Sequence, residues 1–393
     1  MMIRTTEKLW ELCIRLSNFP FVTLDTEFIR EKTYYPELCL IQIAGPQEEA
    51  CIDPLAPDLD LTPLFDLMQN QAVVKVFHAA RQDVEIFYHL SGQIPSPLFD
   101  TQIAAMVCGY GDNVGYQQLT HDITGVSLDK SMRFTDWSRR PLNEEQVTYA
   151  LHDVTYLRDI YLALKKQLEE NCRTEWLAEE IAVQNNPATY ETNDDDVWRK
   201  MKVPFKRPIQ THVFARLCAW RERTAKQKNR PRKHIIKDDA LIELAVTMPK
   251  TAAEMDSCRN ISNGFGKSVF GQEILQVIAK ALSDPVELYP TEWDKPKHLT
   301  QTQHTLVDLY HLLLMQISSE LNVAPRIIAS MEELQQLARG DNDTPCMKGW
   351  RRDVFGEKVL LFKQGLLSLS YNPQTHRPEL TDRRQNKMGK TND

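Results

Sequence analysis

The sequence lacks the features that would place it among disulfide-rich, zinc-binding or membrane proteins. None of its eight cysteines stands at a C-x-x-C spacing, so neither a zinc knuckle nor a redox pair is indicated. Scattered cysteines in a long chain are typical of reduced thiols. The start of the chain has no apolar signal-peptide stretch, and the densest apolar run, around Leu312 to Ile317, is too short to cross a bilayer. We therefore expect a cytoplasmic protein that makes no membrane contact.

The chain also lacks a G-x-x-x-x-G-K-[ST] phosphate-binding loop, and no polymerase or helicase segment accompanies it. Its 393 residues, 42% hydrophobic and 26% charged, are typical of a globular protein with two or three domains. The net charge of −7 conceals a division. Residues 1–200 hold 17 basic and 32 acidic side chains, a balance of −15, whereas residues 201–393 hold 30 and 22, a balance of +8. The two halves therefore suggest separate tasks on one polyanionic substrate.

Hydrophobic patterning predicts an α/β domain followed by helical ones. Short apolar runs separated by turn residues predict a meander of three strands, and strands then alternate with helices, which implies a mixed sheet flanked by helices. Helical spacing of apolar residues continues from Glu144 to Leu177. The expected strands are Phe21–Glu27, Leu38–Ala44, Ala50–Ile52 and Val73–Phe77, and the expected helices are Leu61–Gln69 and Asp83–Leu90.

The second half contains an internal repeat. Val269-Phe270-Gly271 is echoed 85 residues later by Val354-Phe355-Gly356, and Ile235-Ile236 is echoed by Ile327-Ile328. Two echoes in the same order indicate two copies of one compact all-helical domain. The predicted division is a first domain at 1–186, a linker at 187–207, helical domains at 208–288 and 298–372, and a disordered basic tail at 373–393.

Four carboxylates and a tyrosine form the candidate catalytic site. Asp25 and Glu27 would project from one face of a strand end, Asp83 would lie in the first turn of a helix, and Tyr149 and Asp153 would share a helix face. Each alone fits an ordinary solvated, capping or core-edge position. Together they offer the hard oxygen ligands that suit Mg²⁺ or Mn²⁺, and two such ions roughly 4 Å apart can clamp an in-line phosphoryl displacement.

These motifs resemble the DEDD superfamily of 3′–5′ exonucleases. Tyr149, four residues before Asp153, matches the superfamily's tyrosine branch, whereas the position that carries His in the other branch is Thr148. Residues 109–116, Leu128-Asp129-Lys130 and residues 136–142 are similar to the bacterial ribonuclease D family. The repeated helical unit resembles the HRDC domain. The resemblance implies an RNase H-like exonuclease fold followed by two HRDC-like domains.

The resemblance also implies a mechanism and a substrate. Asp25, Glu27 and Asp153 would hold the metal that activates water, and Asp25 with Asp83 would hold the metal at the leaving 3′ oxygen. Tyr149 would orient the water, because a phenol with an ordinary pKa of about 10 is a poor base near pH 7. A monomeric exoribonuclease would release nucleoside 5′-monophosphates while trimming tRNA precursors and other small structured RNAs. A DNA exonuclease of proofreading or repair type and an inactive RNA-binding scaffold remain the alternatives.

Two further sets of residues are candidates for contacts with RNA. Around the site, Phe28 or Trp137 could stack on a base, His78 or Gln82 could touch sugar or phosphate, and Lys130 or Arg140 could hold phosphates, with core packing or structural bonding as the ordinary alternative. Between Lys200 and Lys237, 13 basic residues and one Glu are interleaved with aromatic residues, which favours sequence-independent phosphate binding over a merely solvated face. This predicted basic patch comprises Lys206, Arg207, Arg216, Arg221, Arg223, Lys226, Lys228, Arg230, Arg232 and Lys233.

Overall fold

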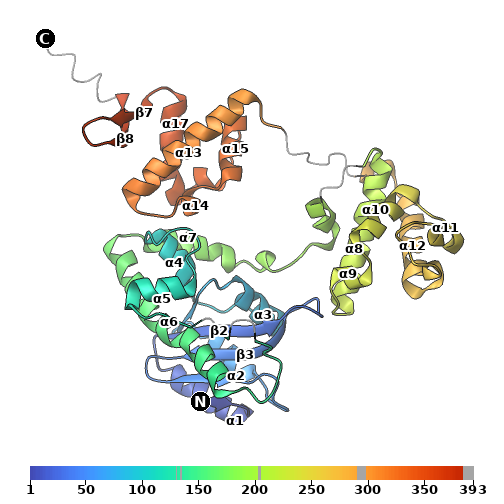
Figure 1. Ribbon diagram of the computed structural model, residues 1–393, viewed down its shortest axis with the longest axis horizontal. Coiled ribbons are helices and arrows are strands. Elements are labelled where there is room, and N and C mark those ends of the chain that lie inside the picture. The colour runs from blue at the N-terminus through green and yellow to red at the C-terminus, as the bar shows by residue number, and fades with distance from the viewer. Residues whose placement is uncertain (130, 133–134, 202–204, 290–297, 384–393) are drawn as a thin grey trace.

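The computed structural model describes residues 1–129, 131–132, 135–201, 205–289 and 298–383. Figure 1 shows three parts: an α/β domain at the N-terminus and two helical domains. Within the described residues, no helix combines the length and hydrophobicity needed to cross a membrane. The expected fold class of an α/β domain followed by helical domains is confirmed.

The α/β domain is built on a six-stranded mixed sheet in the order β1-β4-β3-β2-β5-β6. The predicted meander of β2, β3 and β4 is antiparallel, whereas β5 pairs in parallel with β2 and β6 pairs in parallel with β5. The sequence patterns did not predict the short edge strands β1 and β6, which have two and three residues. The strands are β1 (Met2–Ile3), β2 (Phe21–Ile29), β3 (Glu37–Ala44), β4 (Glu49–Ile52), β5 (Val74–Phe77) and β6 (Leu98–Asp100).

Helices cover the sheet and continue beyond it. The helical spacing expected from Glu144 to Leu177 is divided between two helices, because the chain turns at Cys172, whose φ is +54°. Helix α1, which the patterns also did not predict, packs through Leu9, Leu12 and Leu16. The helices are α1 (Thr6–Leu16), α2 (Thr62–Gln69), α3 (Arg81–Ser91), α4 (Thr101–Val107), α5 (Tyr116–Thr124), α6 (Glu144–Glu170) and α7 (Thr174–Gln184).

The first helical domain begins earlier than expected. Part of the predicted linker is the 3-10 helix η2 (Asp194–Met201), whose buried Trp198 belongs to the same core as Leu217 and Leu241. The absence of helical periodicity there reflects a 3-10 helix rather than a free linker. The domain continues with α8 (Pro208–Gln227), α9 (Arg232–Ile235), α10 (Asp238–Thr247), α11 (Ala252–Asp256) and α12 (Val269–Ser283).

The second helical domain repeats this order but ends in a β-hairpin. Strand β7 (Leu367–Asn372) pairs with β8 (Arg377–Asp382), so the expectation of a disordered tail from residue 373 is wrong for β8. Tail residues 384–393 lie outside the described residues. The helices are α13 (Gln301–Leu321), α14 (Pro325–Ile328), α15 (Met331–Arg339), α16 (Gly349–Arg351) and α17 (Glu357–Lys363), with a π-helical turn at Arg352–Gly356.

The echoed glycines occupy crowded positions in both domains. A Cβ on Gly271 would lie 2.2 Å from the Phe265 carbonyl oxygen, and one on Gly356 would lie 3.0 Å from the Cys346 carbonyl oxygen. Both glycines thus allow a helix to approach the preceding turn closely. The sequence repeat therefore has a packing cause, although its two halves differ in helical geometry.

The second helical domain packs against the α/β domain through a continuous core. Tyr310 and Phe355 belong to the same buried cluster as Leu164 of α6. The rings of Trp176 and Trp350 stack with centroids 4.3 Å apart, and the Ala324 N–H donates to the Met106 carbonyl oxygen at 2.9 Å. These contacts join the two parts into one packed unit.

Candidate active site

Strand β2 carries Asp25 and Glu27 past the end of its neighbour. Strand β5 pairs with β2 only at residues 21–23, whereas β3 continues alongside, with Gln42 opposite Asp25. The opening left by β5 forms a cavity of about 270 Å³. Its lining includes Asp25, Glu27, Asp153 and Tyr149.

Helix α6 is tied to the same strand. The Thr23 hydroxyl donates to the Val154 carbonyl oxygen at 2.7 Å, which fixes the neighbouring Asp153 over β2. Asp25, Glu27 and Asp153 each offer one oxygen, and these oxygens lie within 4.8 Å of one another. Three of the four predicted carboxylates are thus brought together by a strand and a helix distant in sequence.

Asp83 lies beside this cluster rather than inside it. Its carboxylate accepts a hydrogen bond from the Thr26 hydroxyl, on the residue between Asp25 and Glu27. The turn that presents Asp83 is held by buried Asp100, which accepts from the backbone N–H groups of Ala79 at 3.0 Å and Ala80 at 2.9 Å. Ala79 adopts a φ of +58°, an uncommon conformation for a non-glycine residue.

The carboxylates repel one another. Burial, reinforced by the other three carboxylates, raises the pKa of Glu27 to about 9. Burial raises the pKa of Asp25 to about 6, and burial together with the Asp25 charge raises that of Asp153 to about 8. For Asp83, burial and then the charge of Asp25 raise the pKa well above its ordinary value. Such a cluster of acids is the donor set that a divalent cation satisfies, so the residues fit a metal.

Tyr149 lies at the cavity with Trp137 behind it. Their ring centroids are 6.2 Å apart, and Trp137, only 3% exposed, packs with Cys39, Cys51 and Ala150. Trp137 is therefore a packing residue in this structure. The predicted stacking of Trp137 on a base finds no support in its burial.

Arg140 also has a structural position, which argues against its predicted contact with phosphate. Its five N–H groups are occupied by the Asp53 carboxylate at 2.7–3.0 Å and by the carbonyl oxygens of Trp137, Arg139 and Cys39. Arg140 thus fastens the segment before α6 to the sheet. Asp53, 3% exposed, has a lowered pKa because its bonds to Arg140 outweigh the cost of burial.

The remaining substrate candidates differ in position. His78 lines the cavity, and its Nδ1 lies 3.0 Å from the Thr101 hydroxyl, while burial lowers its pKa and favours the neutral ring. Gln82 is exposed on the first turn of α3 and does not line the cavity, and Phe28 is half-buried against the main core. Lys130 lies outside the described residues.

Two site residues were missed from the sequence. Tyr116 lines the cavity and donates to the His152 carbonyl oxygen at 2.8 Å, and the glycine-containing stretch around it was the available signal. Gln42 is fully buried opposite Asp25, and neither its Oε1 nor its Nε2 has a hydrogen-bond partner among the described residues. The apolar run Leu38–Ala44 predicted a strand but did not indicate that its one glutamine faces the site.

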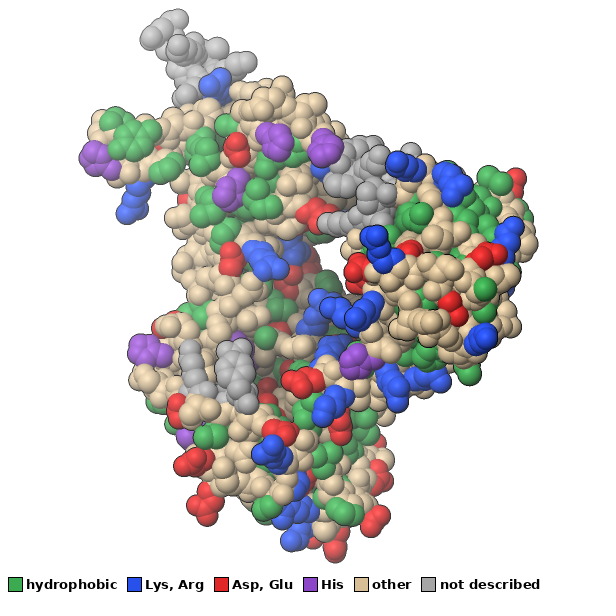
Figure 2. All heavy atoms as spheres, turned by 45° about the vertical axis from the view of Figure 1, so that its right-hand side comes forward, with side chains coloured by type: hydrophobic (Ala, Val, Ile, Leu, Met, Phe, Trp, Pro, Cys, Tyr) green, Lys and Arg blue, Asp and Glu red, His purple; other side chains and the backbone are tan. Residues whose placement is uncertain are grey.

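The predicted basic patch is divided between internal bonding and exposure. Arg221 is buried against Asp238, Arg232 bonds to Glu222, and Lys226 bonds to Asp194. Arg216 and Arg223 lie 3.9 Å from Asp195. The side chains exposed to solvent include Lys206, Arg207, Lys228, Arg230 and Lys233. Figure 2 shows lysine and arginine side chains gathered around the hollow between the first helical domain and the rest of the molecule.

Comparison with known proteins gives a consistent result. The model of a 3′–5′ exonuclease family matches residues 1–169, and that of the HRDC domain matches residues 210–278. The chain is 49% identical to ribonuclease D of Bartonella henselae, over 88% of this chain and 85% of that protein. It is 44% identical to ribonuclease D of Nitrobacter hamburgensis, over 94% and 96% of the two chains.

A solved structure agrees in fold. The crystal structure of Escherichia coli RNase D, described as an exoribonuclease involved in structured RNA processing, aligns with a TM-score of 0.79 and 29% identity. The alignment covers 93% of this chain and 98% of that one. The shared architecture therefore includes both the exonuclease domain and the helical domains that follow it.

Proposed function

The chain belongs to the ribonuclease D family and is a 3′–5′ exoribonuclease, and from this premise we propose how its residues act and on what. Dependence on divalent metal is a property of the family. We propose Mg²⁺ or Mn²⁺ as the ion, because the candidate ligands are all carboxylate oxygens. Asp25, Glu27 and Asp153 would hold one ion, and Asp25 with Asp83 a second. When bound, the ions supply a water of lowered pKa and offset charge at the leaving 3′ oxygen.

The chain's own residues orient the reactants. Tyr149, at the wall of the cavity, positions the attacking water through its hydroxyl, and burial behind it by Trp137 limits the motion of its ring. Because the Thr101 hydroxyl donates to the Phe77 carbonyl oxygen, neutral His78 donates from Nδ1 to Thr101 and offers its Nε2 as an acceptor to a hydroxyl of the terminal sugar. The observation that carries the proposal is the convergence of three carboxylate oxygens within 4.8 Å at the end of an apolar strand.

The proposed substrates are the 3′ ends of tRNA precursors and other small structured RNAs, and the proposed products are nucleoside 5′-monophosphates. Exposed basic residues of the first helical domain, Lys228 and Arg230 among them, would hold the RNA by its phosphates. The second helical domain would be a further HRDC-like domain. We further propose that the protein acts in the cytoplasm as a monomer.

The test is hydrolysis of a 5′-labelled RNA with an unpaired 3′ end, compared with its DNA counterpart and with Asp25→Asn. We expect stepwise shortening of RNA with Mg²⁺ or Mn²⁺, slower shortening of DNA, and loss of activity in Asp25→Asn with RNA binding retained. Equal activity of the wild type and Asp25→Asn would exclude the metal mechanism. Equal rates on RNA and DNA would return the DNA exonuclease to consideration.

A further inference from the structure

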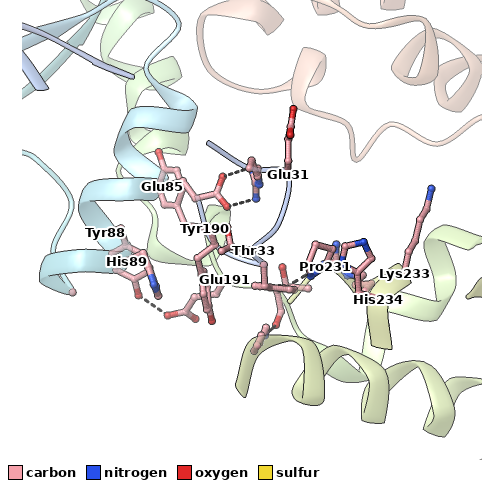
Figure 3. A pocket seen from close by; sticks show the side chains of 17 residues that line it. Glu31, Thr33, Glu85, Tyr88, His89, Tyr190, Glu191, Pro231, Lys233 and His234 are labelled. Carbon is pink, nitrogen blue, oxygen red and sulfur yellow. Dashed lines mark hydrogen bonds and ion pairs between the residues drawn. The ribbon is translucent and has the colours of Figure 1, made fainter. Parts of the chain in front are cut away.

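A second cleft, of about 910 Å³, lies between the α/β domain and the first helical domain. Figure 3 shows Glu85, Tyr88 and His89 of α3 on one side and Pro231, Lys233 and His234 on the other. The loop that follows β2 lies between them. The cleft has the size of a ligand site but lies outside the carboxylate cavity.

The walls of this cleft are joined at the β2–β3 loop. The Asn229 side-chain oxygen accepts from the backbone N–H groups of Tyr34 at 3.1 Å and Tyr35 at 3.0 Å. The Tyr34 hydroxyl donates to Glu222, which is 1% exposed and also bonds to Arg232. The guanidinium of Arg232 lies 5.1 Å from the centroid of the Tyr34 ring. These bonds connect the first helical domain to the strand that carries Asp25 and Glu27.

Aromatic rings line the α/β side of the cleft. Tyr35 and His89 stack with centroids 3.7 Å apart and an interplanar angle of 12°. Tyr88 is fixed by donating to Glu191 at 2.6 Å. Burial lowers the pKa of His89, which favours a neutral ring. A pre-stacked pair of rings at the edge of a cleft is the kind of platform on which unpaired bases stack.

An exposed lysine stands on the opposite wall. Lys233 and its neighbour His234 are exposed at α9, whereas Arg30 is already paired with Glu85 at 2.8 Å. Glu31 and Glu191 also line the cleft. This mixture of basic and acidic side chains would suit a single strand of RNA that makes few phosphate contacts and is held mainly through its bases.

The cleft begins close to the carboxylate cluster. Arg30 lies three residues beyond Glu27, which at a strand rise of about 3.3 Å per residue is about 10 Å. We propose that the cleft binds the single-stranded RNA nucleotides on the 5′ side of the one being removed. The Tyr35–His89 pair would stack on a base, and Lys233 would contact a phosphate. This inference rests on the proposed exoribonuclease site.

The kinetic test compares substrate lengths on the full-length protein. A dinucleotide fills the carboxylate cavity only, whereas an oligoadenylate of about eight nucleotides reaches the cleft. We expect the ratio of kcat/KM on the long substrate to kcat/KM on the dinucleotide to fall about tenfold in His89→Ala and Tyr35→Ala, since one base stack is lost. The control is the same substitution at His376, which contacts Tyr371 in the β7–β8 hairpin in a tilted arrangement with ring centroids 6.3 Å apart. An unchanged ratio would overturn the proposal.

The binding test is independent of hydrolysis. Fluorescence anisotropy with the same oligoadenylate in EDTA should show about tenfold weaker binding by His89→Ala. For Lys233→Glu, the slope of log Kd against log salt should fall by about 0.7, the share of one phosphate contact. Lys8→Glu, on exposed α1, controls for net charge. If the cleft variants bind RNA with the affinity and salt slope of the wild type, the subsite is refuted. If the wild type fails to cleave RNA but the cleft variants still bind it more weakly than the wild type does, only the proposed nuclease site is refuted.

Discussion

Removal of metal should make Glu27 a source of instability. Its pKa of about 9 means that it keeps its proton at neutral pH in the folded protein, whereas the unfolded chain releases it near 4.5. Because the unfolded state then binds fewer protons, stability falls as pH rises from about 4.5 toward 9. At pH 7 the difference of 2.5 pH units from 4.5, at about 1.36 kcal/mol each, gives a penalty of about 3 kcal/mol.

Glu27→Gln replaces the protonated acid with a neutral isostere and removes that penalty. In EDTA at pH 7, we expect the variant to melt about 6 °C above the wild type, and the difference to shrink as pH approaches 4.5. With Mg²⁺ at about 100 times its Kd, the wild type gains about 2.7 kcal/mol. The variant has lost a metal ligand and gains less stability from Mg²⁺. The difference between the two melting temperatures therefore becomes smaller or changes sign.

Thermal unfolding followed by circular dichroism from pH 4.5 to 8.5, with EDTA or Mg²⁺, measures both effects. Glu11→Gln, on an exposed position of α1, makes the same substitution away from the cluster and should leave the melting temperature almost unchanged. A Glu27→Gln protein that melts below the wild type in EDTA at pH 7 would refute the reasoning that the carboxylates repel one another without metal.

Three further outcomes are expected. Tyr149→Phe should lower kcat about 100-fold with little change in KM, because its hydroxyl orients water rather than binding RNA; steady-state kinetics on a labelled oligonucleotide will show it. Arg140→Ala should cost about 3 kcal/mol in denaturant unfolding, because buried Asp53 would keep only the more exposed Arg4, 3.5 Å away, as a basic partner; a large loss of RNA affinity instead would restore the predicted phosphate contact of Arg140. Gln42→Leu should weaken Mg²⁺ binding about tenfold in calorimetric titration, since its unpartnered amide lies opposite Asp25; unchanged affinity would make it a packing residue.

The sequence predicted the elements whose signal is local. The apolar runs of β2, β3 and β5 and the helical spacing of α6 were sufficient to assign the acidic site residues to a strand end and to helices. Edge strands β1 and β6 are too short to show a pattern, and they form because they can pair with β4 and β5. Asp153 is held near Asp25 by the Thr23–Val154 hydrogen bond. This bond joins residues far apart in the sequence, so residue spacing could not predict it.

Residue roles were harder to predict than positions. Arg140 and Arg221 have the composition of phosphate ligands, yet their acidic partners, Asp53 and Asp238, are found only when the chain folds. Charge counted along a sequence does not separate a cation that faces solvent from one already neutralised. The hairpin of β7 and β8 was missed for a related reason, because a polar and basic stretch resembles an unfolded tail until its pairing partner is known.

The core shared by the α/β domain and the second helical domain limits where this protein can be truncated. Arg173 reaches from the turn before α7 to the carbonyl oxygens of Val107 and Leu321, so one guanidinium joins α4 and α13. A chain that stops before α13 would leave that cation, and the face of Trp176 that stacks on Trp350, uncovered in water. Truncated proteins intended as a minimal nuclease should therefore aggregate. Deletion of the residues between α7 and α13 would leave this interface intact.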